Sequence, residues 1–135
     1  MRTVSVTRHV GAPPTAVRHH LDPMTLVDAE GTFRAIDRLE EDDGVTVVAK
    51  GGGMEVAFRF VETDAGYEYE QQGEAGPFET MRTTVTIEPE DEGSRVTMES
   101  TVSLGLPLAA VTDRVAAWKR KGELERALST IAEDV

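Results

Sequence analysis

The side chains best suited to binding a small molecule are aromatic residues that recur at every second position in two neighbouring segments. Phe58 and Phe60 fall in one segment, and Tyr67, Tyr69 and Gln71 fall in the next. Alternate positions of a strand share one face, so each series is expected to point to the same side of a sheet. Phenol hydroxyls among phenylalanine and methionine side chains suit a mostly apolar ligand that carries a few polar groups.

The same periodicity extends this candidate set to later segments and to the C-terminal part of the chain. The predicted lining of a binding site is Phe58, Phe60, Tyr67, Tyr69, Gln71, Glu79, Met81, Met98, Ser100, Val111, Val115 and Trp118. For Phe58, Phe60 and Met98, plain core packing is the competing interpretation. For Gln71 and Glu79, which lie near the ends of their segments, exposure to solvent is the competing interpretation.

Acid–base chemistry has three candidate residues, Glu79, Tyr69 and His20, which would act together if the chain is an enzyme. A buried Glu79 with a raised pKa would favour that hypothesis. His19 and His20 precede Asp22, but adjacent helical side chains point about 100° apart, so both imidazoles cannot chelate one ion from a regular helix. The chain contains no cysteine, which excludes a thiolate nucleophile and cysteine-based zinc sites. We expect no metal site and no cofactor.

Size and hydropathy predict a single domain over residues 1–135. No apolar run approaches the ~18 residues that a membrane span needs. The N-terminal sequence MRTVSVTRHV alternates like a strand and lacks the apolar core of a signal peptide, so a cytoplasmic protein is expected.

The charge balance is strongly acidic. Twenty-five acidic residues face fourteen basic ones, which gives a formal net charge of −11. Such a surface repels phosphate backbones and predicts no binding to nucleic acid. A basic partner is one interpretation of this charge, and adaptation to high salt is the other. Only three of the basic residues are lysines, a pattern that resembles the proteomes of salt-loving archaea and favours the second interpretation.

Periodicity predicts a strand over 3–10, two short helical segments before Gly31, and six strands from Thr32 to about Leu104. The strands from Gly44 onward are joined by short turns rich in Asp and Gly, which predicts an antiparallel meander. A helix is expected from about Pro107 almost to the end of the chain, and at ~1.5 Å per residue it would be roughly 37 Å long. Its predicted inner stripe is Leu108, Val111, Val115, Trp118, Gly122, Leu124, Leu128 and Ile131.

This order of elements resembles the helix-grip fold of the START-like, or SRPBCC, superfamily. The resemblance rests on TVSVTRHVGAPPTAVRHHL at one end of the chain and on GLPLAAVTDRVAAWKRKGELERALSTI at the other. It implies an α+β fold in which a curved, seven-stranded antiparallel sheet wraps around a long C-terminal helix, with two short helices after the first strand. Members of the superfamily use the gap between the sheet and the helix as a ligand cavity.

The resemblance leaves three classes of function open. The first is binding or transport of a small hydrophobic molecule, lipid-like or polyketide-like, and the absence of an obvious catalytic set favours it. The second is a polyketide cyclase/dehydrase-type enzyme that acts on a hydrophobic substrate in the same cavity. The third is a protein-interaction role, which the Glu, Arg and Thr residues expected on the outer sheet face argue against. The oligomeric state stays open.

Overall fold

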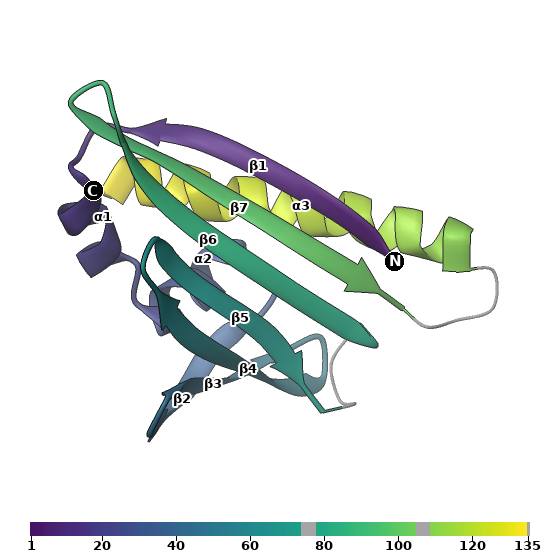
Figure 1. The fold of residues 1–135 in the computed structure, drawn as a ribbon. Helices are drawn as coiled ribbons and strands as arrows, with labels where there is room; N and C mark the ends of the chain where they lie inside the picture. The colour runs from purple at the N-terminus through teal and green to yellow at the C-terminus, as the bar shows by residue number, and fades with distance from the viewer. Residues whose placement is uncertain (74–77, 105–108, 135) are drawn as a thin grey trace.

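The computed structural model describes residues 1–73, 78–104 and 109–134, apart from the side chains of 109–112. Its elements follow the predicted order (Figure 1): β1 (Arg2–Val10), α1 (Pro14–His20), α2 (Pro23–Glu30), β2 (Arg34–Glu41), β3 (Gly44–Gly51), β4 (Met54–Thr63), β5 (Gly66–Gln72), β6 (Thr80–Glu90), β7 (Gly93–Ser103) and α3 (Ala109–Asp134). The predicted α+β helix-grip fold is therefore confirmed.

The seven strands form one antiparallel sheet in the order β1-β7-β6-β5-β4-β3-β2. Strands β2 to β7 make a meander in which each strand pairs with the next, and β1 adds to the far side of β7. Their register aligns inward-facing positions across the sheet. Val6 is opposite Met98, for example, and Met98 is opposite Val85. The sequence periodicity thus produces one continuous inner face.

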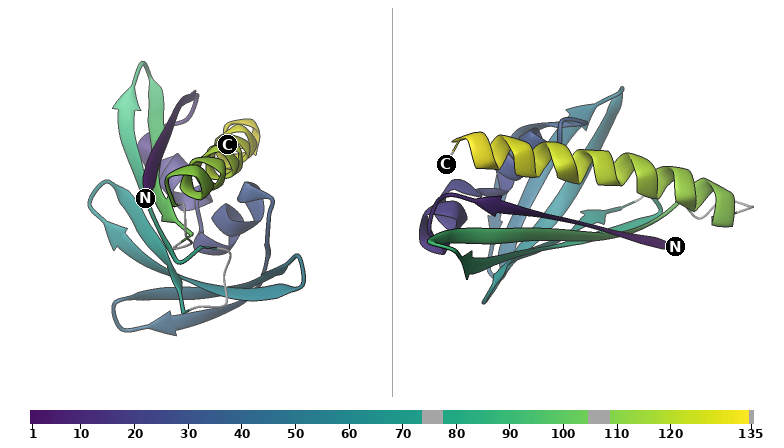
Figure 2. Two further views of the ribbon diagram at one scale, coloured as in Figure 1. Left: turned by 90° about the vertical axis from the view of Figure 1, so that its right-hand side faces the viewer. Right: turned by 90° about the horizontal axis from the view of Figure 1, so that it is seen from above.

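The helices cover this inner face unequally. Helix α3 packs against β1, β7 and α2, whereas α2 packs against β2 and β3 (Figures 1 and 2). The buried apolar side chains of the strands, α1, α2 and α3 form one cluster between these layers. Helix α2 consequently lies between α3 and the β2–β3 half of the sheet.

The two short helices are separated by a Pro-containing junction that also caps the second one. The Asp22 carboxylate accepts a hydrogen bond from the Met24 backbone N–H at 3.2 Å, and Pro23 occupies the first turn. Both features favour a helix start at this point. Gly31 ends α2 with φ of 85°, a left-handed conformation in which glycine has no Cβ penalty. The junction fixes the position of α2, and hence of Glu30 at its end.

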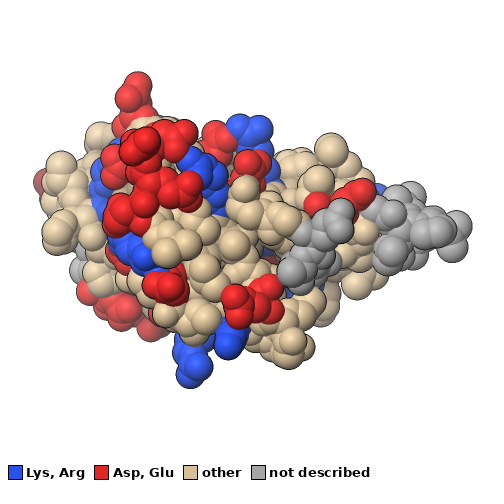
Figure 3. All heavy atoms as spheres, turned by 90° about the horizontal axis from the view of Figure 1, so that it is seen from below, with Lys and Arg blue, Asp and Glu red and all other residues tan. Residues whose placement is uncertain are grey.

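Several carboxylates at the surface are paired with arginines. On the outer sheet face Arg59 contacts Glu41 and Asp43. Arg38 lies on the side of β2 that faces α2, and it contacts Asp22 and Glu40. Figure 3 shows red and blue groups gathered side by side on the face that carries β2 to β4. Exposed ion pairs of this kind contribute only about 0–1 kcal/mol each to the free energy of folding, so they add little to the stability of the protein.

The predicted inner stripe of α3 is wrong in its N-terminal half. Val115 and Trp118 are 62% and 78% exposed, respectively. The side chains buried in this half are Asp113, Ala116, Ala117, Arg120 and Glu123, whereas Leu124, Leu128 and Ile131 are buried as predicted. The expected positions Leu108 and Val111 lie outside the described residues and side chains. At about 100° per residue, Val115 and Trp118 lie on the opposite side of the helix from Leu124, Leu128 and Ile131, so the two halves of the predicted stripe cannot both face inward. The side that carries Leu124, Leu128 and Ile131 is the buried one, and it also carries Asp113 and Arg120.

The carboxylate of Asp113 joins the start of α3 to the end of β7. This buried group accepts hydrogen bonds from the Leu104 backbone N–H at 2.8 Å and from the Ser103 hydroxyl at 3.5 Å, and it pairs with the ammonium group of Met1. The Leu104 hydrogen bond, together with the Met1 ammonium, lowers the pKa of Asp113. The charged form is thus stabilised by folding.

We predict that Asp113→Asn destabilises the protein in a pH-dependent way. Because the folded pKa is lowered, the contribution of the carboxylate is present above the unfolded pKa of about 3.9 and is lost as the pH falls through the folded value. Urea unfolding should therefore show a lower midpoint for the variant at neutral pH and a smaller difference from wild type at acidic pH. Glu133→Gln, at an exposed position of the same helix, is the control. An equal difference at both pH values would contradict this prediction.

Candidate functional site

A row of inward-facing side chains crosses the middle of the sheet. Phe60, Tyr69, Thr83 and Ser100 occupy directly paired positions on β4, β5, β6 and β7. Each is at most 2% exposed. The rings of Phe60 and Tyr69 stack with centroids 4.4 Å apart, and the hydroxyls of Thr83 and Ser100 share a hydrogen bond of 2.8 Å. The row therefore presents three hydroxyl groups to the layer beneath α3.

Arg120 of α3 lies over this row and is 2% exposed. Its Nε donates to the Ser100 hydroxyl at 3.0 Å, and its Nη2 donates to the hydroxyls of Thr83 at 2.8 Å and Tyr69 at 3.0 Å. The guanidinium carbon also lies 5.8 Å from the centroid of the Tyr69 ring. One side chain of the helix thus binds β5, β6 and β7 together.

Two buried carboxylates complete the arrangement. Glu30 of α2 lies 3.0 Å from Arg120 Nη2 and also accepts the hydrogen bond of the Tyr69 hydroxyl. Glu123, one turn along α3, accepts from Arg120 Nη1 at 3.4 Å. We call Glu30, Tyr69, Thr83, Ser100, Arg120 and Glu123 the charged cluster. Among the described residues, no buried side-chain nitrogen or oxygen lacks a hydrogen-bond partner.

Burial and mutual charge set the protonation states in the charged cluster. Burial alone would lower the pKa of Arg120, but the Glu30 carboxylate and its other partners raise it above the usual range. Burial, reinforced by the charge of Glu30, raises the pKa of Tyr69 well above 10. At neutral pH the guanidinium is thus charged and the phenol neutral, with the Tyr69 O–H donated to Glu30 and the Arg120 N–H groups donated to the hydroxyls and carboxylates of the cluster. Tyr69 is a hydrogen-bond donor rather than a base.

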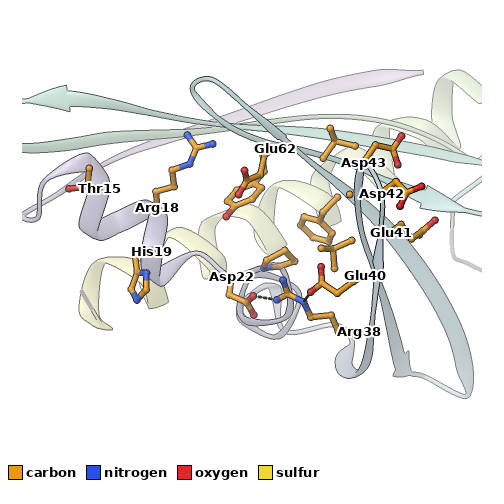
Figure 4. A pocket seen from close by; sticks show the side chains of 16 residues that line it. Thr15, Arg18, His19, Asp22, Arg38, Glu40, Glu41, Asp42, Asp43 and Glu62 are labelled. Carbon is orange, nitrogen blue, oxygen red and sulfur yellow. Dashed lines mark hydrogen bonds and ion pairs between the residues drawn. The ribbon is translucent and has the colours of Figure 1, made fainter.

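An open pocket of about 770 Å³ lies at one end of the sheet, between α1, the start of α2 and the β2–β3 turn (Figure 4). Its lining combines apolar side chains such as Val45, Phe60 and Tyr67 with the arginines Arg18 and Arg38 and several carboxylates. Phe60 lines this pocket and also stacks on Tyr69. One aromatic pair therefore connects the open pocket to the charged cluster.

Most of the predicted lining residues do face the interior. Phe58, Phe60, Tyr67, Tyr69, Met81, Met98 and Ser100 are all buried. Gln71 is half-buried, and its side-chain amide exchanges two hydrogen bonds with the backbone of Phe78, at 2.6 and 3.3 Å. Their role in binding stays a prediction, whereas their inward orientation is observed.

The three candidate acid–base residues are not brought together. Glu79 is exposed because it precedes β6, so the strand periodicity does not apply to it. His20 is half-buried at the end of α1, and its Nε2 lies 4.0 Å from an Asp134 carboxylate oxygen at the end of α3. Among the described residues, no hydrogen bond or ion pair joins Glu79, His20 and Tyr69. Val115 and Trp118, on the outside of α3, are also excluded from the inner lining.

The sequence analysis missed the charged residues of the cluster. From the sequence alone, one would assign Glu30, Arg120 and Glu123 to the surface, because charged side chains are rarely buried without partners. Two signals nevertheless pointed to them. Thr83 and Ser100 occupy inward positions and require a partner, and Arg120 and Glu123 have the i, i+3 spacing of a helical ion pair.

Comparison with known families identifies the class of protein. The family model described as "Polyketide cyclase / dehydrase and lipid transport" matches residues 1–135. The chain therefore belongs to the polyketide cyclase/dehydrase and lipid transport family. A search of curated proteins found no match.

Solved structures with the same fold come from several bacteria. The protein TTHA0849 from Thermus thermophilus has a TM-score of 0.76 at 20% identity, covering 98% of this chain and 95% of its own. The Zhui aromatase/cyclase from a Streptomyces species has a TM-score of 0.71 at 16% identity, with coverages of 96% and 93%. A START superfamily protein from Mycobacterium smegmatis has a TM-score of 0.69 at 15% identity, with 97% of both chains covered. At these identities the likeness concerns the fold.

Two further observations concern membrane-spanning helices and metal sites. No helix formed by the described residues combines the length and hydropathy that a membrane span requires. Within the same residues, no group of three or more His, Cys, Asp or Glu side chains is arranged to hold a metal ion.

We predict opposite effects on stability for single and combined substitutions in the charged cluster. Arg120→Met alone leaves two buried carboxylates without their cation, and loss of one partner of a buried pair costs about 3–5 kcal/mol. The combination of Arg120→Met, Glu30→Leu and Glu123→Leu removes all three charges and should be neutral or stabilising by about 1–4 kcal/mol. Urea unfolding measures both. A combined variant that is less stable than the single one would show that the buried charges are indispensable to the fold.

We also predict that both tyrosines resist ionisation in the folded protein. Burial, with the charge of Glu62 as a smaller cause, raises the pKa of Tyr67, and burial raises that of Tyr69 further. Because the folded pKa values are raised, their contribution to stability is present below the unfolded value of about 10 and is lost at higher pH. Tyrosinate absorbance should thus appear only above pH 10, and that of Tyr69 should accompany unfolding. Tyr69→Phe isolates Tyr67, and two midpoints near 10 in the folded wild type would contradict the prediction.

Proposed function

We propose that this protein binds a small, largely hydrophobic molecule in the layer between the sheet and α3, and that the charged cluster contacts a polar group of that molecule. The observation that carries the proposal is the presence of Arg120, with its donors directed at the inner sheet face, in the middle of an otherwise apolar layer. The apolar surroundings would hold the body of the ligand, and the cluster would orient it.

Stability alone does not account for these buried charges. A buried ion pair or triad can usually be replaced by apolar side chains of similar volume without loss of stability. A guanidinium held by three hydroxyls and two carboxylates is, however, a preorganised donor. A ligand oxygen would replace one of these acceptors at a guanidinium that is already held in place, which lowers the ordering cost of binding.

The comparisons support hydrophobic molecules as the class of ligand. The description of the family names both polyketide cyclase/dehydrase activity and lipid transport. The fold is shared with an aromatase/cyclase and with a START superfamily protein. Carriage without chemistry is our preferred form of the proposal, because Glu79 and His20 lie away from Tyr69.

A cyclase/dehydrase-type reaction is the second candidate, and the Tyr69–Glu30–Arg120 contacts favour it. The guanidinium of Arg120 would polarise a ligand carbonyl by donating a hydrogen bond to its oxygen in place of the Tyr69 hydroxyl, which accepts that bond here. The Glu30 carboxylate, which contacts both, would accept a proton from the adjacent carbon. This set replaces the one that the sequence analysis proposed.

Native mass spectrometry of the protein purified from its own host distinguishes these candidates. We expect a retained small molecule that can be extracted and identified. Release of that molecule unchanged after incubation supports carriage. Conversion of the molecule by the wild type but not by Tyr69→Phe would instead assign the enzymatic role.

A matched pair of probes tests the role of the charged cluster. We expect wild-type protein to bind 2-naphthol about 10–100-fold more tightly than naphthalene, since a hydrogen bond to a charged group contributes about 1.5–3 kcal/mol. The combined variant Arg120→Met, Glu30→Leu, Glu123→Leu should lose this preference while it still binds naphthalene. Titrations followed by protein NMR measure both affinities.

The control for this comparison is Arg82→Met, which removes an exposed arginine from the outer face of β6. It should leave both affinities unchanged. If the combined variant, once shown to be folded, retains the preference for 2-naphthol, the cluster does not contact the ligand and the proposal fails.

A further inference from the structure

The outer side of α3 carries an exposed aromatic side chain next to a hollow. Trp118, the single tryptophan of the chain, is 78% exposed, and Val115 one turn earlier is 62% exposed. One turn after Trp118, Gly122 borders a hollow of about 570 Å³ that Ala29 of α2 also lines. Residues at i and i+4 share one face of a helix, so Trp118 and this hollow face the same direction.

The glycine at position 122 is not required by the packing of this chain. A glycine inside a helix costs about 1 kcal/mol relative to alanine. Among the described residues, a Cβ at Gly122 would meet only the Arg126 Nη1 atom, at an ordinary contact distance of 3.5 Å. Glycine also permits close approach of another group to the backbone. An external group that enters the hollow would explain both the glycine and the space.

We propose that the occupant of this hollow is Trp118 of a second copy of the chain. Two α3 helices would pack antiparallel about a two-fold axis that crosses their outer faces midway between the levels of Trp118 and Gly122, and each tryptophan would enter the hollow beside the partner's Gly122. Because Trp118 and the hollow lie one turn apart on the same face, a single two-fold rotation satisfies both contacts at once. Such an interface is self-complementary and closes as a dimer.

The charges on this side of α3 fit the same arrangement. Arg114, Lys121 and Glu125 are all exposed, and helical spacing places them on the same edge of this face as Trp118. In an antiparallel pair, the edges that meet carry Glu125 of one copy beside the basic residues of the other. Two of the three lysines of the chain, Lys119 and Lys121, are exposed on either side of this face, and they offset part of the repulsion between two chains of net charge −11.

The single tryptophan makes the interface directly observable. We expect sedimentation to show twice the 14.7 kDa chain mass as the concentration rises from micromolar to millimolar. Trp118 emission should shift to the blue over the same range, because the indole leaves water. Gly122→Leu fills the hollow with a better helix former, and it should weaken association at least tenfold while Trp118 emission stays that of an exposed indole.

The matched control is Glu88→Leu, which adds the same side chain at an exposed position of β6. It should leave association unchanged. A wild type that stays monomeric at all concentrations overturns the proposal. A dimer that Gly122→Leu does not weaken, with emission that stays unshifted, also overturns it. So does a blue shift that occurs only with vesicles containing anionic lipid, because the occupant is then a membrane surface.

Discussion

The guanidinium of Arg120 is the interaction on which the arrangement of the layers depends. It contacts β5, β6 and β7 through Tyr69, Thr83 and Ser100, and it contacts α2 through Glu30. Helix α3 is thus joined to the sheet and to α2 by one side chain that has no access to water. A group with five N–H donors in a fixed plane is suited to bind several elements at once. This contact places the inward hydroxyls of Tyr69, Thr83 and Ser100 beneath α3.

The strands were predictable because their signal is local. Period-two alternation determines which residues of β4 to β7 face inward, and the structure confirms this for Phe58, Tyr69, Met81 and Met98. The same rule failed at Glu79, because the alternation continues in the sequence beyond the point where the strand begins. The contact of His20 with Asp134, at the far end of the chain, could not be predicted either, since a short helix gives little information about its distant neighbours.

The charged cluster could not be predicted because its members come from distant parts of the chain. Sequence alone places Thr83 and Ser100 on the inner face, but it does not show that Arg120 or Glu30 will reach them. Charged residues are usually exposed, so Trp118 was assigned inward and Arg120 outward. The C-terminal half of α3 was predicted correctly because Leu124, Leu128 and Ile131 do lie on the buried side, whereas Trp118 falls on the opposite side of the same regular helix.

A comparison of the two possible rotations of α3 explains why the observed one is stable. Turning Trp118 inward would bury roughly 200 Å² of apolar surface and gain about 5 kcal/mol. The same rotation would carry Arg120 to the surface, and with it Leu124, Leu128 and Ile131, which share its side of the helix. It would leave Glu30 as a buried carboxylate without its cation, at a cost of about 3–5 kcal/mol. The hydroxyls of Tyr69, Thr83 and Ser100 would also lose the charged donor from which they accept, and a hydrogen bond to a charged group contributes about 1.5–3 kcal/mol. The losses exceed the gain, so the polar row of the sheet and the apolar side chains that share the side of Arg120 together select the rotation. The exposure of Trp118 is therefore a consequence of the burial of the opposite side of α3, which carries Arg120.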